Sequence, residues 1–316
     1  MHGFIPIAGQ DDSYIVEEGP EEIERRLMTG DCREEMKRIN PSTIDLIVTD
    51  PPYFLDGLDS AWRKGGDDSP RATGSVGGLP VGMKFDPAQG KALQDFMTPV
   101  AEEMIRVLKP GSFALVFSQP RLNHRMTIAL ENAGFEIRDL CVWHYKSKSQ
   151  FKAFKQDHFV RRMQISEDAK AHIITSMDGR KTPQLRGQHE TIILAQKPRN
   201  GTFVENWMRW ETGLMDARAS LDGNCPSNVM EVEKADRAER GPAASHLTPK
   251  PLRLLRHLIE LFSTQGQTVL DPFLGSGSTA VAALEMGRDW RGVELNPQYA
   301  GLALRRIRET GLCHPH

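Results

Sequence analysis

The sequence lacks several features that would assign it to common classes of protein. It has no apolar run near the roughly 18 residues that a membrane-spanning helix needs. Its first 12 residues do not combine a basic region with an apolar stretch, so we expect no signal peptide. The four cysteines are widely separated, which argues against a zinc site and against a disulfide framework: Cys32, Cys141, Cys225 and Cys313. We therefore expect a cytoplasmic protein without membrane or metal.

Net charge is also small, at −2 over 316 residues, and alone it argues against a nucleic-acid partner. The charge is unevenly distributed, however. Residues 143–199 carry twelve Lys or Arg and only five Asp or Glu, with aromatic side chains between them. Such a basic stretch predicts phosphate contacts with DNA. The residues that we expect to bind DNA are Lys146, Lys148, Lys152, Lys155, Arg161 and Arg162.

Strand and helix patterns alternate along the chain, which is typical of a wound, largely parallel sheet. The apolar patterns predict strands at 44–49, 112–117, 136–144, 190–196, 268–272 and 290–294. They predict helices at 92–108, 121–133, 251–262, 278–286 and 297–309, with Pro99 as a boundary or kink in the first. Residues 55–87 are rich in glycine and predict a mobile loop, whereas 199–245 are polar and predict no clear fold.

The most informative motif is Asp50-Pro51-Pro52-Tyr53, which follows the predicted strand 44–49. Ligands bind at this end of the strands in open α/β sheets. Two prolines make a stiff turn and donate no N–H, so the turn offers a carboxylate and carbonyl oxygens beside an aromatic ring. This combination suits a planar group that carries an NH2.

A second motif, residues 268–279 with the sequence TVLDPFLGSGST, follows a later strand. Its glycines allow a ligand to approach the backbone closely. About 20 residues on, the next strand ends at Glu294, where a nucleotide-binding half places its acceptor for ribose hydroxyls. The glycine spacing is not the full G-x-G-x-x-G, so a ribose-bearing ligand without a pyrophosphate is favoured.

Together these motifs resemble the amino-group DNA methyltransferases that use S-adenosylmethionine. The D-P-P-Y block stands N-terminal to Phe273-x-Gly275-x-Gly277, an order that resembles the β group of this family. Further blocks match in order: T-G-D-C at 29–32, W-x-x-K at 143–146 and H-E-T at 189–191. The block at 246–251, HLTPKP, resembles the family's H-P-T-Q-K-P but has leucine and proline at its second and fourth positions.

The resemblance implies a set of site residues. Catalysis is assigned to Asp50, Pro51, Pro52 and Tyr53, with Tyr53 stacking on a base that has left the duplex. The cofactor is S-adenosylmethionine, and its binding is assigned to Asp31, Cys32, Asp50, His246, Thr248, Lys250, Asp271, Phe273, Gly275, Ser276, Gly277, Glu294 and Asn296.

The resemblance also implies a division of the chain. Residues 25–146, 187–198 and 246–312 are expected to form the Rossmann-like catalytic domain, with the catalytic half N-terminal and the cofactor half C-terminal. Residues 147–186 and 199–245 are expected to form an inserted target-recognition region that binds duplex DNA. Members of the β group are often dimers, so a homodimer is implied by resemblance alone.

The function that the resemblance implies is methylation of the N6 amino group of adenine, because in this family Asp rather than Ser before the prolines favours adenine. Cytosine-N4 methylation remains an alternative, since the two activities share these motifs. Methylation of a protein glutamine is disfavoured by the block order. A DNA-binding regulator with a vestigial cofactor fold is the non-enzyme alternative.

Overall fold

The core of the protein is an eight-stranded sheet. The computed structural model describes residues 26–52, 75–76, 79–80, 87–146, 153–236, 239 and 249–312. The strand order is β1 (Leu27–Thr29), β10 (Asp289–Glu294), β9 (Thr268–Asp271), β2 (Ile44–Thr49), β5 (Leu108–Ser118), β7 (His189–Gln196), β6 (Glu136–His144) and β8 (Val229–Glu231). All pairs are parallel except those of β7, which runs against its neighbours. The predicted Rossmann-like, mostly parallel sheet is confirmed.

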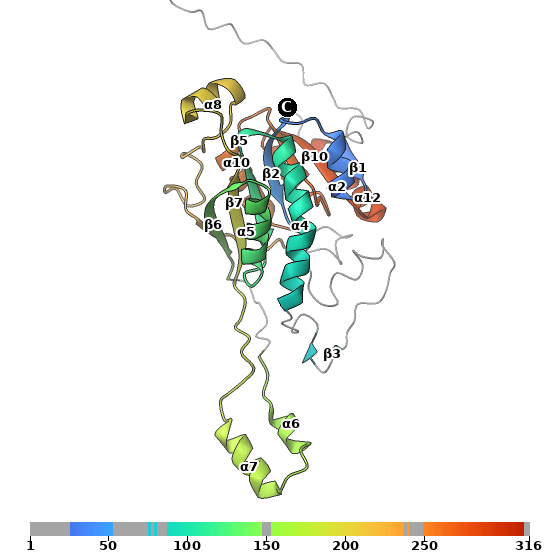
Figure 1. Ribbon diagram of the computed structural model, residues 1–316, viewed down its shortest axis with the longest axis vertical. Helices are drawn as coiled ribbons and strands as arrows, with labels where there is room; N and C mark the ends of the chain where they lie inside the picture. Colours follow the sequence, from blue (N-terminus) through green and yellow to red (C-terminus); the bar gives the residue numbers. More distant parts are fainter. Residues whose placement is uncertain are drawn as a thin grey trace, which may run out of the picture.

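Helices cover both faces of this sheet (Figure 1). One face carries α2 (Cys32–Glu35), the 3-10 turn η1 (Met36–Arg38), α4 (Pro87–Val107) and α5 (Asn123–Asn132). The other carries α10 (Leu252–Phe262), α11 (Ser278–Glu285) and α12 (Pro297–Leu312). Side chains of β5 alternate between the two cores: Phe113, Leu115 and Phe117 face one, Ala114 and Val116 the other.

Two boundaries differ from those that the sequence predicts. Helix α4 begins at Pro87 and continues through Pro99, so the predicted boundary at that proline is wrong. Pro99 cannot donate to the carbonyl of Asp95, and Asp95 is an exposed residue, so the missing hydrogen bond falls on the solvent side of the helix. Strand β5 begins at Leu108, four residues before the predicted start, and accommodates Gly111 at φ +80°.

The long insertion between β6 and β7 forms an arm that projects from the body of the molecule (Figure 1). Here "the arm" means residues 153–188, which contain α6 (Asp157–Arg161) and α7 (Glu167–Ser176). No residue of α7 is buried. This region is therefore an ordered helical pair, although its sequence has weak apolar patterning.

Residues 199–245, predicted to have no clear fold, contain α8 (Phe203–Trp210) and β8. Helix α8 begins with a capping box between Thr202 and Glu205. Most of the predicted 55–87 loop lies outside the described residues. Within it, Ser75–Val76 (β3) and Leu79–Pro80 (β4) pair as short antiparallel strands. None of the helices in the described part of the chain is long and apolar enough to cross a membrane.

Asn206 attaches helix α8 to strand β5 of the sheet. Its side chain is fully buried and donates to the carbonyls of Pro110 (3.0 Å) and Thr212 (2.9 Å). It also accepts from the N–H of Asn200 at 2.9 Å. The helix is therefore anchored by polar contacts, which apolar periodicity does not reveal.

We expect Asn206→Ala to lower the free energy of unfolding by about 1–3 kcal/mol, because it leaves buried backbone groups without partners. Urea denaturation followed by circular dichroism measures the change. Asn132→Ala, at an exposed position on α5, is the control and should change stability little. Equal stability of the Asn206 variant and the wild type would show that these hydrogen bonds contribute nothing.

Candidate active site

The two sequence motifs meet at the centre of the sheet. Strands β2 and β9 are parallel neighbours, with Ile47 opposite Leu270, although more than 200 residues separate them in the sequence. The turns that follow them therefore emerge at the same edge. Helix α4, which follows β2, and α11, which follows β9, cover opposite faces. This is the point of an open α/β sheet at which ligands bind.

A cavity of about 260 Å³ lies at this edge. Both turns and the end of β10 contribute to its wall. Its lining residues are Asp50, Pro51, Pro52, Pro249, Lys250, Leu255, Asp271, Phe273, Leu274, Gly275, Ser276, Ser278, Thr279, Glu294 and Tyr299. A larger cavity of about 950 Å³ is lined by residues that precede β9 and β10, such as Gln267 and Arg288, and contains none of the predicted site residues.

Asp271 is a buried carboxylate that ties the two halves of the site together. It accepts from the hydroxyls of Thr49 (2.6 Å) and Thr279 (2.7 Å) and from the N–H of Phe273 (3.0 Å). Burial raises the pKa of Asp271 to about 6, although these hydrogen bonds oppose the rise. The carboxylate thus organises the start of the glycine-rich turn from within.

Glu294 closes the opposite side of the cavity. Its carboxylate accepts from the N–H groups of Gly275 and Asn296, each at 2.8 Å. Burial raises the pKa of Glu294, and these backbone N–H groups lower it in part. Gly277 has φ +81°, and a Cβ there would lie 3.1 Å from the Cβ of Ala303, so the turn requires glycine. Asn296 and Gly277 support the cavity without lining it.

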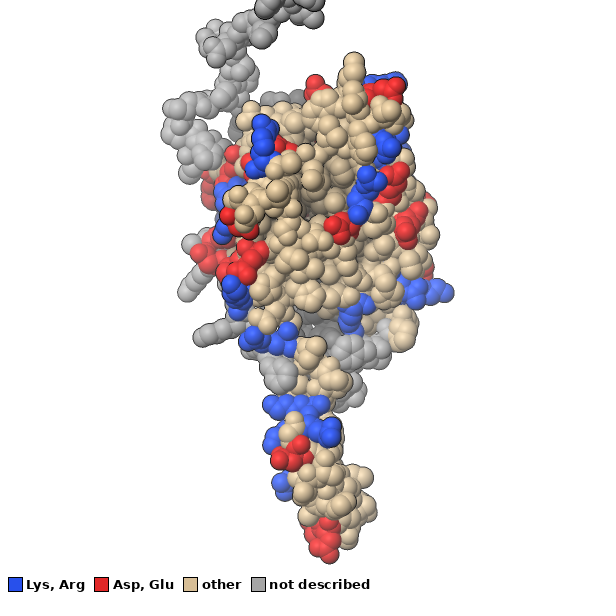
Figure 2. All heavy atoms as spheres, turned by 90° about the vertical axis from the view of Figure 1, so that its left-hand side faces the viewer, with Lys and Arg blue, Asp and Glu red and all other residues tan. Residues whose placement is uncertain are grey.

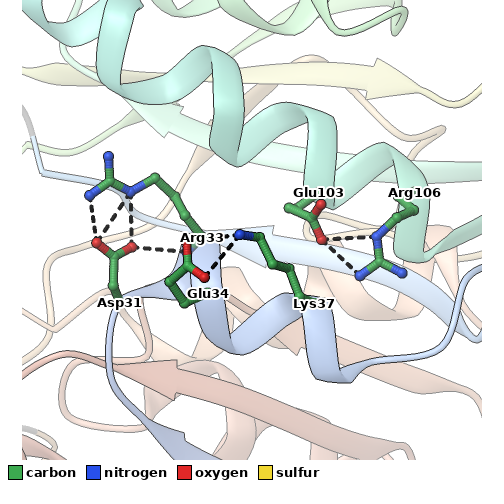
Figure 3. A network of polar contacts seen from close by, with 6 residues as sticks. All are labelled: Asp31, Arg33, Glu34, Lys37, Glu103 and Arg106. Atoms are coloured by element: carbon green, nitrogen blue, oxygen red, sulfur yellow. Dashed lines mark hydrogen bonds and ion pairs between the residues drawn. The ribbon is translucent and has the colours of Figure 1, made fainter.

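Asp31 and Cys32 lie near the cavity but do not line it. Strand β1 pairs with β10, and the N–H of Gly30 donates to the carbonyl of Glu294 at 3.0 Å. Asp31 caps α2 and faces the guanidinium of Arg33 at 2.5 Å, a contact seen in Figure 3. Burial raises the pKa of the Cys32 thiol to about 12, so this side chain is a core residue.

Lys250 lies two residues before the start of α10 and contributes to the cavity wall. Its side chain is only 9% exposed, and its ammonium donates to Asp50 Oδ2. It also lies 3.3 Å from Glu190 Oε2. Sequence reasoning quoted Glu190 within H-E-T but assigned it no role, because its position depends on the direction of β7. Tyr53, His246 and Thr248 lie outside the described residues.

Four of the six predicted DNA-binding residues lie in the part of the chain that the structure describes. Lys155, Arg161 and Arg162 belong to the arm. Figure 2 shows Lys and Arg atoms on the part of the arm nearer the body, and Asp and Glu atoms at its tip. Lys146 follows β6 and donates to Glu231 of β8 at 2.5 Å. Lys148 and Lys152 lie outside the described residues. The arm leaves after β6 and returns before β7, at the edge of the sheet that carries the cavity.

Comparison with known proteins agrees with this geometry. The family model described as DNA methylase, for the N6 and N4 enzymes, matches residues 44–305. The chain belongs to the N6/N4 DNA methylase family. It is 30% identical to the type II methyltransferase M.HindIII of Haemophilus influenzae, over 86% of this chain and 92% of that protein. It is 27% identical to the DNA adenine methyltransferase YhdJ of Escherichia coli, over 90% and 82%.

Solved structures show the same fold. The crystal structure of TTHA0409 from Thermus thermophilus, complexed with S-adenosyl-L-methionine, aligns with a TM-score of 0.54 at 21% identity, covering 92% of this chain and 95% of that one. The cytosine-N4-specific PvuII DNA methyltransferase aligns with a TM-score of 0.57 at 16% identity, covering 90% of each.

The cofactor of this N6/N4 DNA methylase is S-adenosylmethionine, and the residues present fit it. Glu294 presents a buried acid at the end of β10, suited to ribose hydroxyls, and Phe273 places an aromatic ring in the cavity wall. Gly275 allows close approach of the backbone at φ +55°. No group of three His, Cys, Asp or Glu suited to a metal occurs in the part of the chain that the structure describes.

The raised pKa of Asp271 predicts a specific dependence of stability on pH. An acid whose pKa is about 6 in the folded protein, against an ordinary value of 3.8, binds its proton more tightly when folded. Its contribution to stability is full below pH 3.8 and is lost as the pH rises through 6. Between about pH 4 and pH 6, which spans this window, the wild type should lose stability relative to Asp271→Asn.

Thermal unfolding of both proteins across this pH range measures the difference. Thr279→Val removes one hydrogen bond that favours the carboxylate and should move the transition to higher pH. Parallel curves for the wild type and Asp271→Asn would contradict the raised pKa.

Proposed function

We propose that the protein transfers a methyl group from S-adenosylmethionine to the N6 amino group of adenine in duplex DNA. The observation that carries this proposal is the Asp50 carboxylate in the wall of the cofactor cavity, directly after the central strand β2. An acceptor at that point suits an amino group that must approach the methyl donor. Adenine is favoured over cytosine because Asp precedes the prolines, and because a relative over 90% of this chain is named a DNA adenine methyltransferase.

The chain's residues act mainly by position and polarity. The exocyclic amine is a poor nucleophile, because its lone pair is delocalised into the ring. Asp50 accepts one of its hydrogens and the Pro51 carbonyl accepts the other, which stabilises the positive charge that develops on nitrogen. S-adenosylmethionine supplies a methyl group already activated by its sulfonium. The nitrogen loses one proton to Asp50 as it gains the methyl group, and the bond between sulfur and methyl breaks to release S-adenosylhomocysteine.

The cofactor is held by residues from both halves of the chain. When the cofactor binds, Glu294 would accept from the ribose hydroxyls, and Phe273 and Asp31 would contact the adenine. Lys250 would meet the methionine end. The other residues that we assign to cofactor binding are Cys32 (through its backbone), His246, Thr248, Asp271, Gly275, Ser276, Gly277 and Asn296.

The DNA substrate is held outside the sheet. We assign residues 147–186 and 199–245 to target recognition, and Tyr53 to stacking on a base flipped out of the duplex. The position of the arm at the same edge as the cavity supports this assignment. We also propose that the protein forms a homodimer, and that it is located in the cytoplasm, bound to DNA.

The identity of the methylated base is tested directly. Duplex DNA is incubated with the protein and labelled S-adenosylmethionine, then digested, and the nucleosides are separated. We expect the label in N6-methyl-2′-deoxyadenosine. Label in N4-methyl-2′-deoxycytidine would establish the cytosine alternative. If the protein neither transfers a methyl group nor binds the cofactor in calorimetry, the alternative of a DNA-binding regulator with a vestigial cofactor fold would be supported.

Asp50→Ala should lower the single-turnover rate by about 100-fold or more, because it removes an acceptor used mainly in the transition state. Cofactor affinity should fall much less. Asp95→Ala, at an exposed position on α4, controls for loss of a surface carboxylate. A wild-type rate in Asp50→Ala would exclude the proposed role of this carboxylate.

The arm predicts a salt-dependent contribution to DNA affinity. Replacing Lys155, Arg161 and Arg162 with alanine should reduce the slope of log affinity against log salt by about 0.9 for each lost phosphate contact. Fluorescence anisotropy with a labelled duplex measures this slope.

The control is a second triple variant that removes the same number of positive charges at the edge of the sheet opposite the cavity. It replaces Lys37, Arg38 and Arg138, which pair with glutamates at that edge. Equal effects of the two triple variants would show that the arm makes no particular contact with DNA.

A further inference from the structure

The ammonium of Lys250 lies between two carboxylates that come from different strands. It donates to Asp50 Oδ2 and lies 3.3 Å from Glu190 Oε2. The Lys250 side chain is 9% exposed, against 31% for Asp50 and 22% for Glu190. A lysine this well buried stays charged only with anionic partners close by. Both carboxylates therefore stabilise the same cation.

The strand order explains how the three residues meet. Strand β5 lies between β2, which precedes Asp50, and β7, whose second residue is Glu190. Because β7 is antiparallel to β5, with Thr191 opposite Ser118, its first residues lie at the carboxyl edge of β5. The Lys250 ammonium stands 5.0 Å from the centre of the Phe117 ring, near the end of β5. The lysine thus bridges from β2 to β7 across the intervening strand.

Other charged and titratable groups face this cluster. Asp271 lies on the β9 side, where the charge of Asp50 adds to the rise in its pKa that burial causes. Tyr145 lies on the β6 side; burial raises its pKa most, Glu190 raises it further, and Lys250 lowers it. The ammonium of Lys234 stands 3.9 Å from the centre of the Tyr145 ring. Burial by itself lowers the pKa of Lys250, yet Asp50 and Glu190 reverse this and leave it raised.

We propose that Glu190 is a positioning residue for methyl transfer: through Lys250 it holds the Asp50 carboxylate in place and keeps it a strong acceptor. This inference rests on the proposed role of Asp50 as the acceptor of the target amine. An ammonium paired with Asp50 alone draws that carboxylate into one tight ion pair and weakens it as an acceptor. Sharing the ammonium with a second carboxylate weakens the first contact, so Asp50 stays oriented and retains acceptor strength for the amine.

The decisive experiment compares Glu190→Gln with Lys250→Met by single-turnover methylation of duplex DNA from pH 3.5 to 9. Glu190→Gln should lower the maximal rate by about 10-fold or more, with cofactor affinity within about twofold of wild type in calorimetry. The two variants remove opposite charges beside Asp50. The acid limb of the rate profile should therefore move to lower pH in Glu190→Gln and to higher pH in Lys250→Met, each by about one unit.

A purely structural role would lower the rate at every pH and move neither limb. Glu190→Asp, which keeps the charge, should recover part of the rate and return the limb toward wild type. Unmoved limbs in both variants, with a wild type that methylates DNA, would overturn the positioning role and leave the proposed function intact. A wild type that transfers no methyl group to DNA would instead overturn the proposed function and this inference with it.

A second measurement does not depend on activity. An amine-reactive ester, applied to the full chain at neutral pH and read by mass spectrometry, should label Lys250 much more slowly than the exposed Lys37. Glu190→Gln should speed labelling of Lys250 by about 10-fold, since losing one anion lowers the pKa of the amine. Wild-type labelling of Lys250 as fast as that of Lys37 would show that the ion cluster is absent and overturn the proposal.

Discussion

The parallel pairing of β2 with β9 is the contact on which the rest of the site depends. It joins an N-terminal half that carries Asp50 to a C-terminal half that carries the glycine-rich turn. The hydroxyl of Thr49 donates to Asp271 across this pair, so the last residue of one strand is tied to the last residue of the other. Neither half contains a complete cavity wall, and the position of each depends on a register set by buried apolar residues.

Much of this architecture follows from the sequence, because apolar runs and turn residues are local signals. Strand β2 has the predicted bounds, and α10 begins and ends within one residue of the prediction. The sequence did not predict α7 and α8, because these helices are not stabilised by a periodic apolar face. Helix α8 is anchored by the buried amide of Asn206, and α7 has no buried residue at all. Neither arrangement leaves a strong pattern of apolar spacing.

The candidate site shows the same division between local and long-range information. The sequence identifies the acceptor turn, the glycine turn and the acid at Glu294, since each follows a recognisable strand. It does not reveal that Lys250 contacts both Asp50 and Glu190, because that contact depends on strand order and on the reversed direction of β7. Motif reasoning assigned the lysine to the cofactor alone. The structure places it in contact with Asp50 and Glu190.

The position of the arm between two antiparallel neighbours has a consequence for how this enzyme changes over evolution. The last residue of β6, His144, lies opposite the first residue of β7, His189, so both ends of the insertion are attached at adjacent points of one edge. Paired residues in such strands stand only about 5 Å apart. An insertion of another length or sequence closes across the same short gap without altering the strands. Under the proposal that this insertion reads the DNA, a new sequence preference requires only a new insertion, and the strands that carry the cavity stay the same.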